Sequence, residues 1–559
     1  MDNQKNLLLA VVFSLVILIG FDFFFAPKKS EINKVQVNEN ISEESLDKNT
    51  PSIDSSLVKK SNEIKSSEKR IKFKANRIEG SINLFGATID DIILSDYFQT
   101  IEKKKKIQVL QQENSNSPYF LRMGWASTDK SIELPDKNSL WKANKENFNN
   151  EKIKLEWSNN KGLKIIREIS FDENFMITIT DEVINGTSGK IDLTNFSYLR
   201  RKNYEPENKF FILHEGPLGV FNDTLKEVSY DELHENKEIV ESTKNGWIGY
   251  TDHYWQVAIF PDTNESFKAR FKTLNDRRNS IQIDFINNNV KSVEPNSKLV
   301  TKSYVFAGAK EVPLIDNYIK ELNVNKLDLS VDFGWFYFLT KPLFYALNFL
   351  STKFENFGIG IIILTIFIRI ILFPLANKSF KSMNSMRILT PEIQRVRERY
   401  KDDRQKMNQE MFALYREKKI NPAAGCLPIL IQIPIFFALY KVLFVSIEMR
   451  HAPFFGWIKD LSAPDPTSLF NLFGLIPWDP PLFLTIGIWP LLMGLTMYLQ
   501  QKINPPPPDP IQAKIFMMLP FIFTFLLATF PSGMVVYWTV NNVLSIGQQY
   551  ILLKKQKKE

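Results

Sequence analysis

The chain has 559 residues, which is enough for two or more domains. Lysine and asparagine are frequent up to about residue 330 and the remainder is strongly apolar, so the formal net charge of +8 belongs to two unlike parts. This split predicts a membrane-embedded region joined to a soluble domain. The single cysteine, Cys426, excludes an intramolecular disulfide framework.

The usual signatures of catalysis are missing from the sequence. It contains no Gly-rich phosphate loop, no Gly-x-Ser-x-Gly elbow and no zinc motif. No pair of histidines has the spacing of metal ligands, since the four are widely scattered: His214, His234, His253 and His451. We therefore predict no catalytic residue, no cofactor, no metal and no small-molecule substrate.

The first element, residues 1–27, is predicted to be a transmembrane anchor. Lys5 precedes an apolar run from Leu7 to Ala26 that is long enough to cross a membrane. A cleaved signal peptide is the alternative, but the small-residue cleavage pattern is missing, since Phe24 and Phe25 precede Ala26 and Pro27 follows it. We favour an uncleaved anchor whose amino terminus lies in the cytoplasm.

Residues 28–70 are rich in Ser, Asn, Lys and Glu with scarcely any aromatic residue, which predicts a disordered tether. From residue 71 to 327 the pattern changes to short alternating runs between Asn, Gly, Asp and Pro turns, followed by a helical linker at Lys310–Leu327. Alternation with period two predicts an antiparallel β-sandwich, which the anchor places outside the cytoplasm. The clearest strand candidates are Ser81–Ile89, Phe175–Ile184, Phe267–Lys272, Ser280–Phe285 and Leu299–Phe306.

An aromatic cluster stands out in this domain, at Gly246–Asp252 followed by Tyr254 and Trp255. It has two interpretations, a binding surface or part of the core. Aromatic residues of a sandwich are more often buried, so we favour the core.

Residues 328–356 alternate aromatic residues and leucine with Lys341, Asn348 and Lys353. The segment is too polar to span a membrane comfortably, and its aromatic residues suit the membrane interface. It is predicted to be an interfacial amphipathic helix. The alternative is a mere lead-in to the next spanning helix.

Residues 357–376 are predicted to be the second transmembrane helix. The apolar run Gly358–Ala376 is long enough to span, yet it contains Arg369. The next polar anchor, Lys378, is nine positions on, which is roughly 13 Å along a helix, and a snorkelling arginine covers about half of that. The two hypotheses are a snorkelling arginine near a helix end and a polar intramembrane cavity open toward Lys378; we favour the cavity.

Residues 377–422 are predicted to form a basic helical hairpin in the cytoplasm. Between residues 377 and 420 there are twelve basic against six acidic residues, and such an excess marks a cytoplasmic loop. Thr390 and Pro391 are predicted to start one amphipathic helix, and Asp402 or Asp403 to cap the second. The charged faces are either solvated or bind a partner such as the ribosome, and the sequence does not decide between these.

Residues 423–553 are predicted to contain transmembrane helices 3 to 6. Gly425–Val445 spans outward, Leu482–Gln500 returns, and Ile515–Leu553 is about twice the length of one span, with Pro531-Ser532-Gly533 dividing it. The loop at 446–481 lacks a basic excess and belongs outside, whereas the basic tail at 554–559 belongs in the cytoplasm. Six spans result, with both termini cytoplasmic.

Besides Arg369, the predicted spans hold uncharged polar residues that include Thr365, Gln432, Thr524, Tyr537, Thr539, Asn541 and Asn542. Thr365, Gln432, Asn541 and Asn542 lie at a depth similar to that of Arg369, and no Asp, Glu or His does. Single amides in a helical bundle usually form hydrogen bonds between helices. A buried arginine without a counter-charge is costly, so a hydrated recess is the cheaper arrangement.

Two motifs resemble a known family, the YidC/Oxa/Alb membrane protein insertases of the Gram-negative bacterial type. One is Asn421–Pro428 with Gln432, Pro434–Phe436 and Ala438–Tyr440 after it; the other is Phe530–Gly533 followed by Tyr537. The resemblance also includes the arginine before the basic hairpin and extends over nearly the whole chain. Two features depart from it, a short carboxyl tail and the residues Trp538 and Asn541, which the family pattern does not require.

The resemblance implies a five-helix insertase core around a hydrophilic groove open to the cytoplasm and to lipid. It implies that Arg369 supplies the charge of this groove, that Thr365, Gln432 and Asn542 line it, and that Tyr537 lies on an adjoining substrate-contact surface. The implied location is the bacterial inner membrane, with the sandwich domain in the periplasm. The implied partners are nascent membrane proteins, the Sec translocon, the ribosome and membrane lipids.

We therefore predict an insertase and chaperone for nascent inner-membrane proteins. A small-solute transporter or channel is the alternative, but it calls for inverted repeats and the chain has no internal repeat. A membrane-anchored sugar-binding or enzymatic sandwich domain is a third hypothesis, and it leaves Arg369 and the basic hairpin without a purpose.

Overall fold

The structure is a computed structural model that describes residues 69–202, 213–262, 265–274, 280–418, 427–478, 480–481, 485–504 and 510–556. The predicted anchor at 1–27, nearly all of the predicted tether, and most of the Asn421–Pro428 motif lie outside the described residues. The chain divides into two compact units, Met1–Asp332 and Phe333–Glu559. The division falls close to residue 330, where the composition changes.

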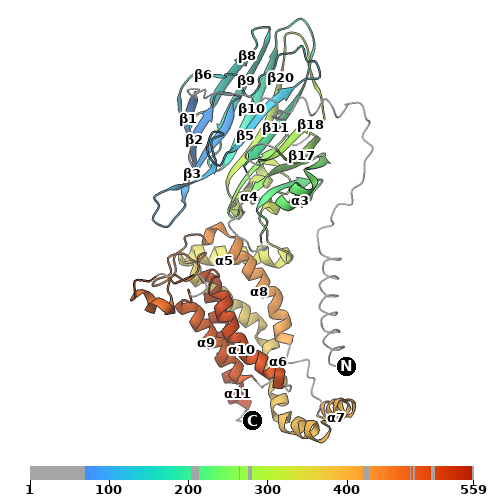
Figure 1. The fold of residues 1–559 in the computed structure, drawn as a ribbon, viewed down its shortest axis with the longest axis vertical. Coiled ribbons are helices and arrows are strands. Elements are labelled where there is room, and N and C mark those ends of the chain that lie inside the picture. The colour runs from blue at the N-terminus through green and yellow to red at the C-terminus, as the bar shows by residue number, and fades with distance from the viewer. Residues whose placement is uncertain are drawn as a thin grey trace. The chain divides into compact units, whose positions relative to one another are not determined.

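The first unit is a sandwich of two β-sheets, as predicted (Figure 1). Alternating burial along the strands, as in the pattern BeBiBe of Ile153–Ser158, places one face of each strand in the shared core. Among the described strands neighbours pair antiparallel, although β1 and β7 pair in parallel.

The order of strands in each sheet departs from their order in the chain, because several connections are crossovers. One sheet runs β14 (Glu238–Thr243), β17 (Phe267–Thr273), β18 (Ile281–Asn287), β11 (Ile191–Arg201), β5 (Tyr119–Ala126), β3 (Thr88–Phe98), β2 (Ile78–Asn83), β1 (Arg70–Lys74) and β7 (Asn147–Asn149), with β19 (Lys291–Val293) beside β11 and β4 (Lys106–Leu110) beside β3. The other runs β13 (Thr224–Glu227), β12 (Gly216–Phe221), β15 (Gly246–Thr251), β16 (Trp255–Phe260), β20 (Ser297–Ala309), β10 (Met176–Asn185), β9 (Leu163–Phe171), β8 (Ile153–Ser158) and β6 (Lys142–Ala143).

Four of the five strand candidates correspond to β10, β17, β18 and β20, whereas the prediction for Ser81–Ile89 is wrong. That segment is a hairpin: β2 ends at Asn83, β3 begins at Thr88, and the turn includes Gly86 and Ala87 at positive φ. Apolar residues occur within the turn and on both sides of it, at Ile82, Leu84, Phe85 and Ile89, so hydrophobicity alone did not reveal it.

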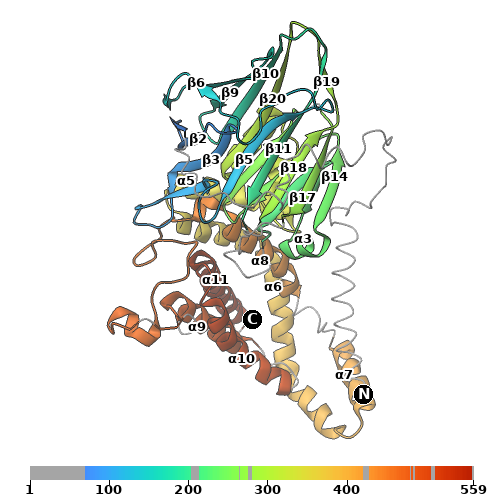
Figure 2. The ribbon, with the colours of Figure 1, turned by 45° about the horizontal axis from the view of Figure 1, so that its top comes forward.

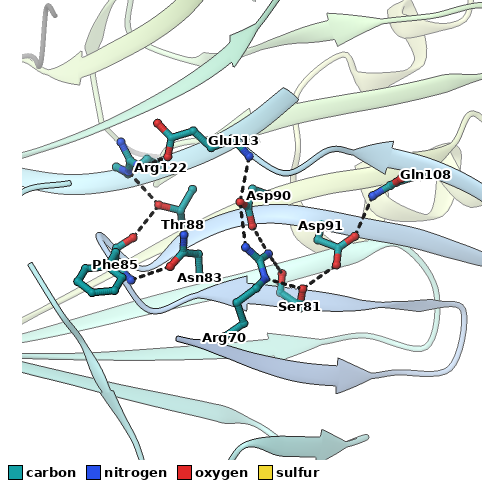
Figure 3. A network of polar contacts seen from close by, with 10 residues as sticks. All are labelled: Arg70, Ser81, Asn83, Phe85, Thr88, Asp90, Asp91, Gln108, Glu113 and Arg122. Atoms are coloured by element: carbon teal, nitrogen blue, oxygen red, sulfur yellow. Dashed lines mark hydrogen bonds and ion pairs between the residues drawn. The ribbon is translucent and has the colours of Figure 1, made fainter. Parts of the chain in front are cut away.

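The same hairpin carries a network of charged and polar groups (Figure 3). Arg70 Nε donates to Ser81 Oγ at 3.0 Å, and Arg70 Nη1 donates to Asp90 Oδ2 at 3.3 Å. Asp91 accepts from Ser81 Oγ at 2.6 Å. Burial raises the pKa of Asp90, and the Arg70 guanidinium opposes that rise. The network ties β1, β2 and β3 together through side chains as well as through the backbone.

The aromatic residues within Gly246–Asp252 belong to the core, as predicted, whereas Tyr254 and Trp255 are only partly buried. Trp247 and Tyr250 are both buried, and each satisfies its polar atom internally. Trp247 Nε1 donates to the carbonyl of Asn325 at 3.1 Å, and the Tyr250 hydroxyl donates to that of Ile281 at 2.9 Å. The helical linker is confirmed as α4 (Val312–Leu322), followed by η2 (Leu327–Ser330); the short α3 (Tyr230–Asn236) precedes β14.

The second unit is helical. Its helices are α5 (Tyr337–Phe354), α6 (Phe357–Arg399), α7 (Arg404–Glu417), α8 (Leu427–Val445), α9 (Ile488–Ile503), α10 (Pro510–Leu527) and α11 (Ser532–Gln556), with the 3-10 segments η4 (Ile447–Met449) and η5 (Leu469–Gly474) between α8 and α9. α11 packs against α6 and α9, α10 packs against α9, and α5 packs against α6 and α8 (Figure 2). The division at Pro531-Ser532-Gly533 is confirmed by the break between α10 and α11.

One prediction about the helices is wrong. No new helix starts at Thr390, because α6 continues unbroken for 43 residues through Pro374 and Pro391. Thr390 Oγ1 donates back to the carbonyl of Met386 at 3.2 Å, which is the bond of a residue inside a helix rather than of a cap. The helix starts instead at Asn356, whose side chain accepts from the amide of Ile359.

The helical hairpin itself is confirmed. Asp403 caps α7, since its Oδ1 accepts from the amide of Lys406 at 3.0 Å. Leu389 and Ile393 of α6 form a buried apolar cluster with Tyr415 of α7. The amphipathic faces therefore meet each other, and the charged faces point outward.

Helix length alone does not give the number of membrane spans. Among the described residues, one helical segment, Phe357–Lys381, is both long and apolar enough to cross a membrane. Gln432–Val445 and Ala513–Leu527 are apolar but shorter, and α9 begins at Ile488 rather than at Leu482. Six spans are therefore not established by helix length.

Candidate functional site

Arg369 lies on the face of α6 that packs against α11. Its side chain is half-buried. Nε donates to Asn541 Oδ1 at 2.9 Å, and Nη2 donates to Ser545 Oγ at 2.5 Å and to the Asn541 carbonyl at 3.3 Å. Within the described part of the chain, no carboxylate is bonded to Arg369 and Nη1 donates to no residue. The guanidinium is thus held on one edge by neutral oxygens, and its positive charge is not cancelled.

The side chains that hold Arg369 belong to a polar stripe on α11. Asn541, Ser545 and Gln548 follow at intervals of four and three residues, which places them on one face of the helix. Gln548 Nε2 donates to Asn377 Oδ1 at 3.0 Å, about two turns beyond Arg369 on α6. The contact between α6 and α11 is therefore polar over several turns.

A second stripe on α11 faces α9. Asn542 Nδ2 donates to Thr496 Oγ1 at 3.2 Å, and Gln549 Nε2 donates to Asn504 Oδ1 at 3.0 Å. Asn542 and Gln549 are seven residues apart, or about two helical turns. α11 thus presents amides to two neighbouring helices at once.

The two remaining predicted site residues on α8 and α11 bind each other. Gln432 Nε2 donates to the Tyr537 hydroxyl at 3.0 Å, and Tyr537 is buried. One residue further along, Trp538 packs edge-on against Phe436 at 4.8 Å between ring centroids. These two contacts join α8 to α11 about one turn before Asn541 and Asn542.

Thr365 lies one turn before Arg369 and is 2% exposed. Its hydroxyl donates to the carbonyl of Ile361 at 2.6 Å, within its own helix. The structure therefore brings Gln432 and Tyr537 together, places Asn542 against α9, and leaves Thr365 satisfied locally. None of these four residues is bonded directly to Arg369.

The sequence placed Asn541 at the depth of Arg369 without assigning it to the site, and Ser545, which also holds Arg369, and Thr496, which binds Asn542, were not predicted. Asn541 is the residue that the resemblance did not require. The signal that could have found Ser545 is its spacing of four from Asn541, since both then lie on the face of α11 that meets α6.

The loop between α8 and α9 closes over the first turn of α11. The amides of Ser532 and Gly533 donate to the carbonyls of Ala463 and Leu461 at 2.8 and 2.9 Å. Asp465, which is buried, accepts from Trp457 Nε1 at 3.0 Å and from the amide of Trp489 at 2.9 Å. The start of α11, whose amides would otherwise be unsatisfied, is thereby fixed to an ordered loop.

The described residues contain no group of three or more His, Cys, Asp or Glu side chains that could hold a metal ion. What the site offers instead is a monovalent cation on a scaffold of amides and hydroxyls. Such a site can attract and orient an anionic group, and it holds no nucleophile paired with a base.

Comparison with known proteins identifies the family. Residues 70–346 match the family described as the YidC periplasmic domain, and residues 349–559 match the 60Kd inner membrane protein family. The chain is 43% identical over 559 residues to the membrane protein insertase YidC of Pelagibacter ubique (strain HTCC1062), with 99% of each chain covered. The chain belongs to the YidC family of membrane protein insertases. A YidC of Rickettsia rickettsii (strain Sheila Smith) is 42% identical over 561 residues, again with 99% of each chain covered.

Among solved structures, a crystal structure of an active YidC insertase with its first transmembrane domain resolved matches with a TM-score of 0.37 and 19% identity. The match covers 87% of this chain and 93% of that one. Membership of the YidC family confirms the predicted resemblance. It makes the chain an inner-membrane protein with a periplasmic domain, in a family of insertases rather than of enzymes.

Proposed function

We propose that this chain inserts nascent proteins into the inner membrane and that the polar contact between α6 and α11, centred on Arg369, is where it receives them. The observation that most supports this proposal is that no described carboxylate neutralises the positive charge of Arg369. Its guanidinium is half-buried in a helix apolar enough to span a membrane, and its bonded partners are uncharged. An arginine kept for structure alone is better served by a carboxylate.

The physical difficulty in insertion is the polar segment that must cross. A charged side chain at the centre of a bilayer costs about 2.5–3.5 kcal/mol even on the lenient scale of translocon insertion. A hydrated recess that reaches part of the way across shortens the apolar path. A fixed positive charge inside it attracts acidic residues of the incoming tail, because the local dielectric constant is lower than that of water.

Each edge of the guanidinium has a separate task in this proposal. Nε and Nη2 hold the side chain against α11, while Nη1 is the donor that meets a carboxylate of the client. Asn541 and Ser545 act as positioning residues. Because they are neutral, they orient the charge without cancelling it.

The other predicted site residues take supporting positions. The Gln432–Tyr537 pair forms the wall on the α8 side, and Asn542 with Thr496 forms the wall on the α9 side. Thr365 packs beneath Arg369 on the same helix, where its small buried side chain sets the depth of the recess. Apolar spans of the client then leave along the exposed bundle surface into lipid, and burial of their apolar area supplies the driving force.

The proposed arrangement in the membrane has six spans, with both termini and the α6–α7 hairpin in the cytoplasm. The twelve basic against six acidic residues of the 377–420 segment support this orientation. The hairpin and the basic tail are the proposed contacts with the ribosome, and the Sec translocon is the proposed partner for larger clients.

The test is a series of substitutions at Arg369, assayed for insertion of a client with an acidic translocated tail. Arg369→Lys keeps a charge and is expected to retain most activity, whereas Arg369→Ala and Arg369→Glu are expected to lose at least tenfold. A client of the same length with an uncharged tail is the control and should be affected much less. Equal insertion of the acidic client by Arg369→Glu and wild type would remove the electrostatic part of the proposal.

A further inference from the structure

The loop between α8 and α9 carries an apolar surface that the insertase site does not use. Seven large apolar side chains between residues 469 and 478 are each 40–83% exposed: Leu469, Phe470, Leu472, Phe473, Leu475, Ile476 and Trp478. We call this segment the 469–478 loop. In Figures 1 and 2 it is drawn in orange and projects sideways from the helical unit next to α9.

The backbone conformation of the loop directs these side chains outward. Leu472 and Phe473 both have left-handed backbone angles, with φ of 49° and 59°. Bulky side chains rarely take this conformation, and two in succession mark a strained turn. The strain is held in place by hydrogen bonds from the amide of Phe473 to the Ser468 carbonyl at 2.8 Å and from the amide of Ile476 to the Asn471 carbonyl at 3.0 Å.

The loop is also fixed to the start of α9. The amide of Leu469 donates to the Ile486 carbonyl at 2.9 Å, and Thr467 Oγ1 accepts from the amide of Ile488 at 3.0 Å. The apolar loop surface is therefore held beside the first turn of a bundle helix. α9 itself exposes Leu492, Leu495 and Leu499, so apolar surface continues from the loop onto the helix.

The length of α9 indicates where this surface lies. Its 16 residues span about 24 Å, which is short of the roughly 30 Å of a bilayer hydrocarbon core. A short helix brings the segment that precedes it down to the level of the lipid. The chain also has no Lys, Arg or His from Asp460 to Gln501, so the loop is not built to bind anionic headgroups electrostatically.

We infer that the 469–478 loop is a lipid-docking surface, which inserts its apolar side chains into the leaflet next to the start of α9. Trp478 suits the boundary between headgroups and acyl chains, where tryptophan is enriched. The loop's apolar side chains then occupy the part of the hydrocarbon core that α9 is too short to span. This inference goes beyond the proposed insertase function and does not depend on the role of Arg369.

The test places a nitroxide label on the full chain in nanodiscs of phosphatidylethanolamine and phosphatidylglycerol. Cys426 is first replaced by Ser, and Leu475→Cys or Ile476→Cys is then labelled. The matched control is Lys459→Cys, a polar exposed position in the same connection between α8 and α9. Elution as a single species and an unchanged helical circular dichroism spectrum verify that each variant is folded.

Labels at residues 475 and 476 are expected to collide at least fivefold more often with oxygen than with a water-soluble nickel reagent, and the label at 459 is expected to show the reverse. Equal access of the nickel reagent to 475, 476 and 459 would overturn the inference, because the loop would then lie in water. Shielding of 475 and 476 from both reagents would also overturn it, because a protein surface rather than lipid would cover the loop.

Discussion

The positive charge of Arg369 is not neutralised, because the side chains that bind it are uncharged. A carboxylate at the same contact would form an ion pair worth roughly 4 kcal/mol at about 4 Å and an effective dielectric constant of about 20. Asn541 instead accepts the same hydrogen bond without a charge, at 2.9 Å from Nε. The distinction between an amide and an acid at one position therefore decides whether the site is electrostatically active.

Asn541→Asp is expected to remove the attraction of Arg369 for acidic client tails without changing the fold. The new carboxylate should pair with Arg369, so insertion of an acidic-tailed client should fall about as far as in Arg369→Ala, while thermal stability stays the same or rises. Asn541→Ala is the matched comparison and should lose only a fewfold, because the charge remains. Client insertion assays and thermal unfolding measure both quantities; an Asp variant as active as the Ala variant would contradict the account.

A second residue-scale prediction concerns His214 in the periplasmic unit. Burial lowers the pKa of His214, so the folded protein holds the ring neutral where the unfolded chain, with a pKa of about 6.5, takes up a proton. A depressed pKa in a base means that stability is lost as the pH falls below that value. The thermal midpoint should drop between pH 7.5 and 5.5, and His214→Gln should reduce this drop by a few degrees. An identical drop in the variant would assign the acid sensitivity to other groups.

The residues of the site show how far sequence reasoning reaches. Arg369 could be found because a charge inside an apolar run is conspicuous. Asn541 and Asn542 could not be told apart, because consecutive residues point about 100° apart on a helix and the sequence does not say which face meets α6. Only the packing of α11 assigns Asn541 to Arg369 and Asn542 to Thr496.

At the scale of elements, the α6–α7 hairpin rests on a small apolar cluster. Leu389, Ile393 and Tyr415 are each less than 10% exposed, whereas Ile388, next to Leu389 on the same helix, is 73% exposed. A charge at Ile393 would have to be buried in this cluster or would separate the two helices. The hairpin therefore offers a matched pair of isoleucines, one buried and one not.

Ile393→Asp is expected to detach α7 from α6, at a local cost of about 2–5 kcal/mol, and to leave the helical bundle intact. Amide hydrogen exchange in α7 should accelerate by more than tenfold. Ile388→Asp places the same charge on the exposed side and should leave exchange unchanged. Similar exchange in the two variants would show that the cluster does not hold the hairpin together.

The elements also show where sequence patterns mislead. Pro391 was expected to start a helix, but it lies inside α6, because a helix can bend around a proline whose ring faces solvent. The hairpin between β2 and β3 was missed for a different reason, since apolar residues occur on both sides of its turn. Boundaries depend on local backbone geometry, which periodicity does not report.

At the scale of the whole molecule, the change in composition near residue 330 correctly located the boundary between Asp332 and Phe333. The β-sandwich and the helical unit each hold their own core, and the residues around Arg369 come entirely from the helical unit. The proposed insertion site therefore needs nothing from the sandwich. The number of spans does not follow from helix length, because several apolar helices among the described residues are shorter than a bilayer core is thick.

Removal of residues 71–309, which ends the deletion after β20, is expected to leave insertion of a small acidic-tailed client largely intact. The physical reason is that the cluster around Arg369 lies wholly outside this segment. Membrane integration of the truncated chain is the control. Complete loss of insertion by a well-integrated truncation would mean that the sandwich takes part in the central step.

Photo-crosslinking can detect whether the tail of a client meets Arg369 inside the membrane. A photoreactive amino acid at Gln432, which borders the site, is compared with one at Ile371, which is 61% exposed on α6. With a stalled client, the account predicts that the acidic tail crosslinks to residue 432 and not to 371, and that the crosslink is lost in Arg369→Glu. Crosslinks from the tail to 371 alone, or crosslinks to 432 that survive Arg369→Glu, would contradict it.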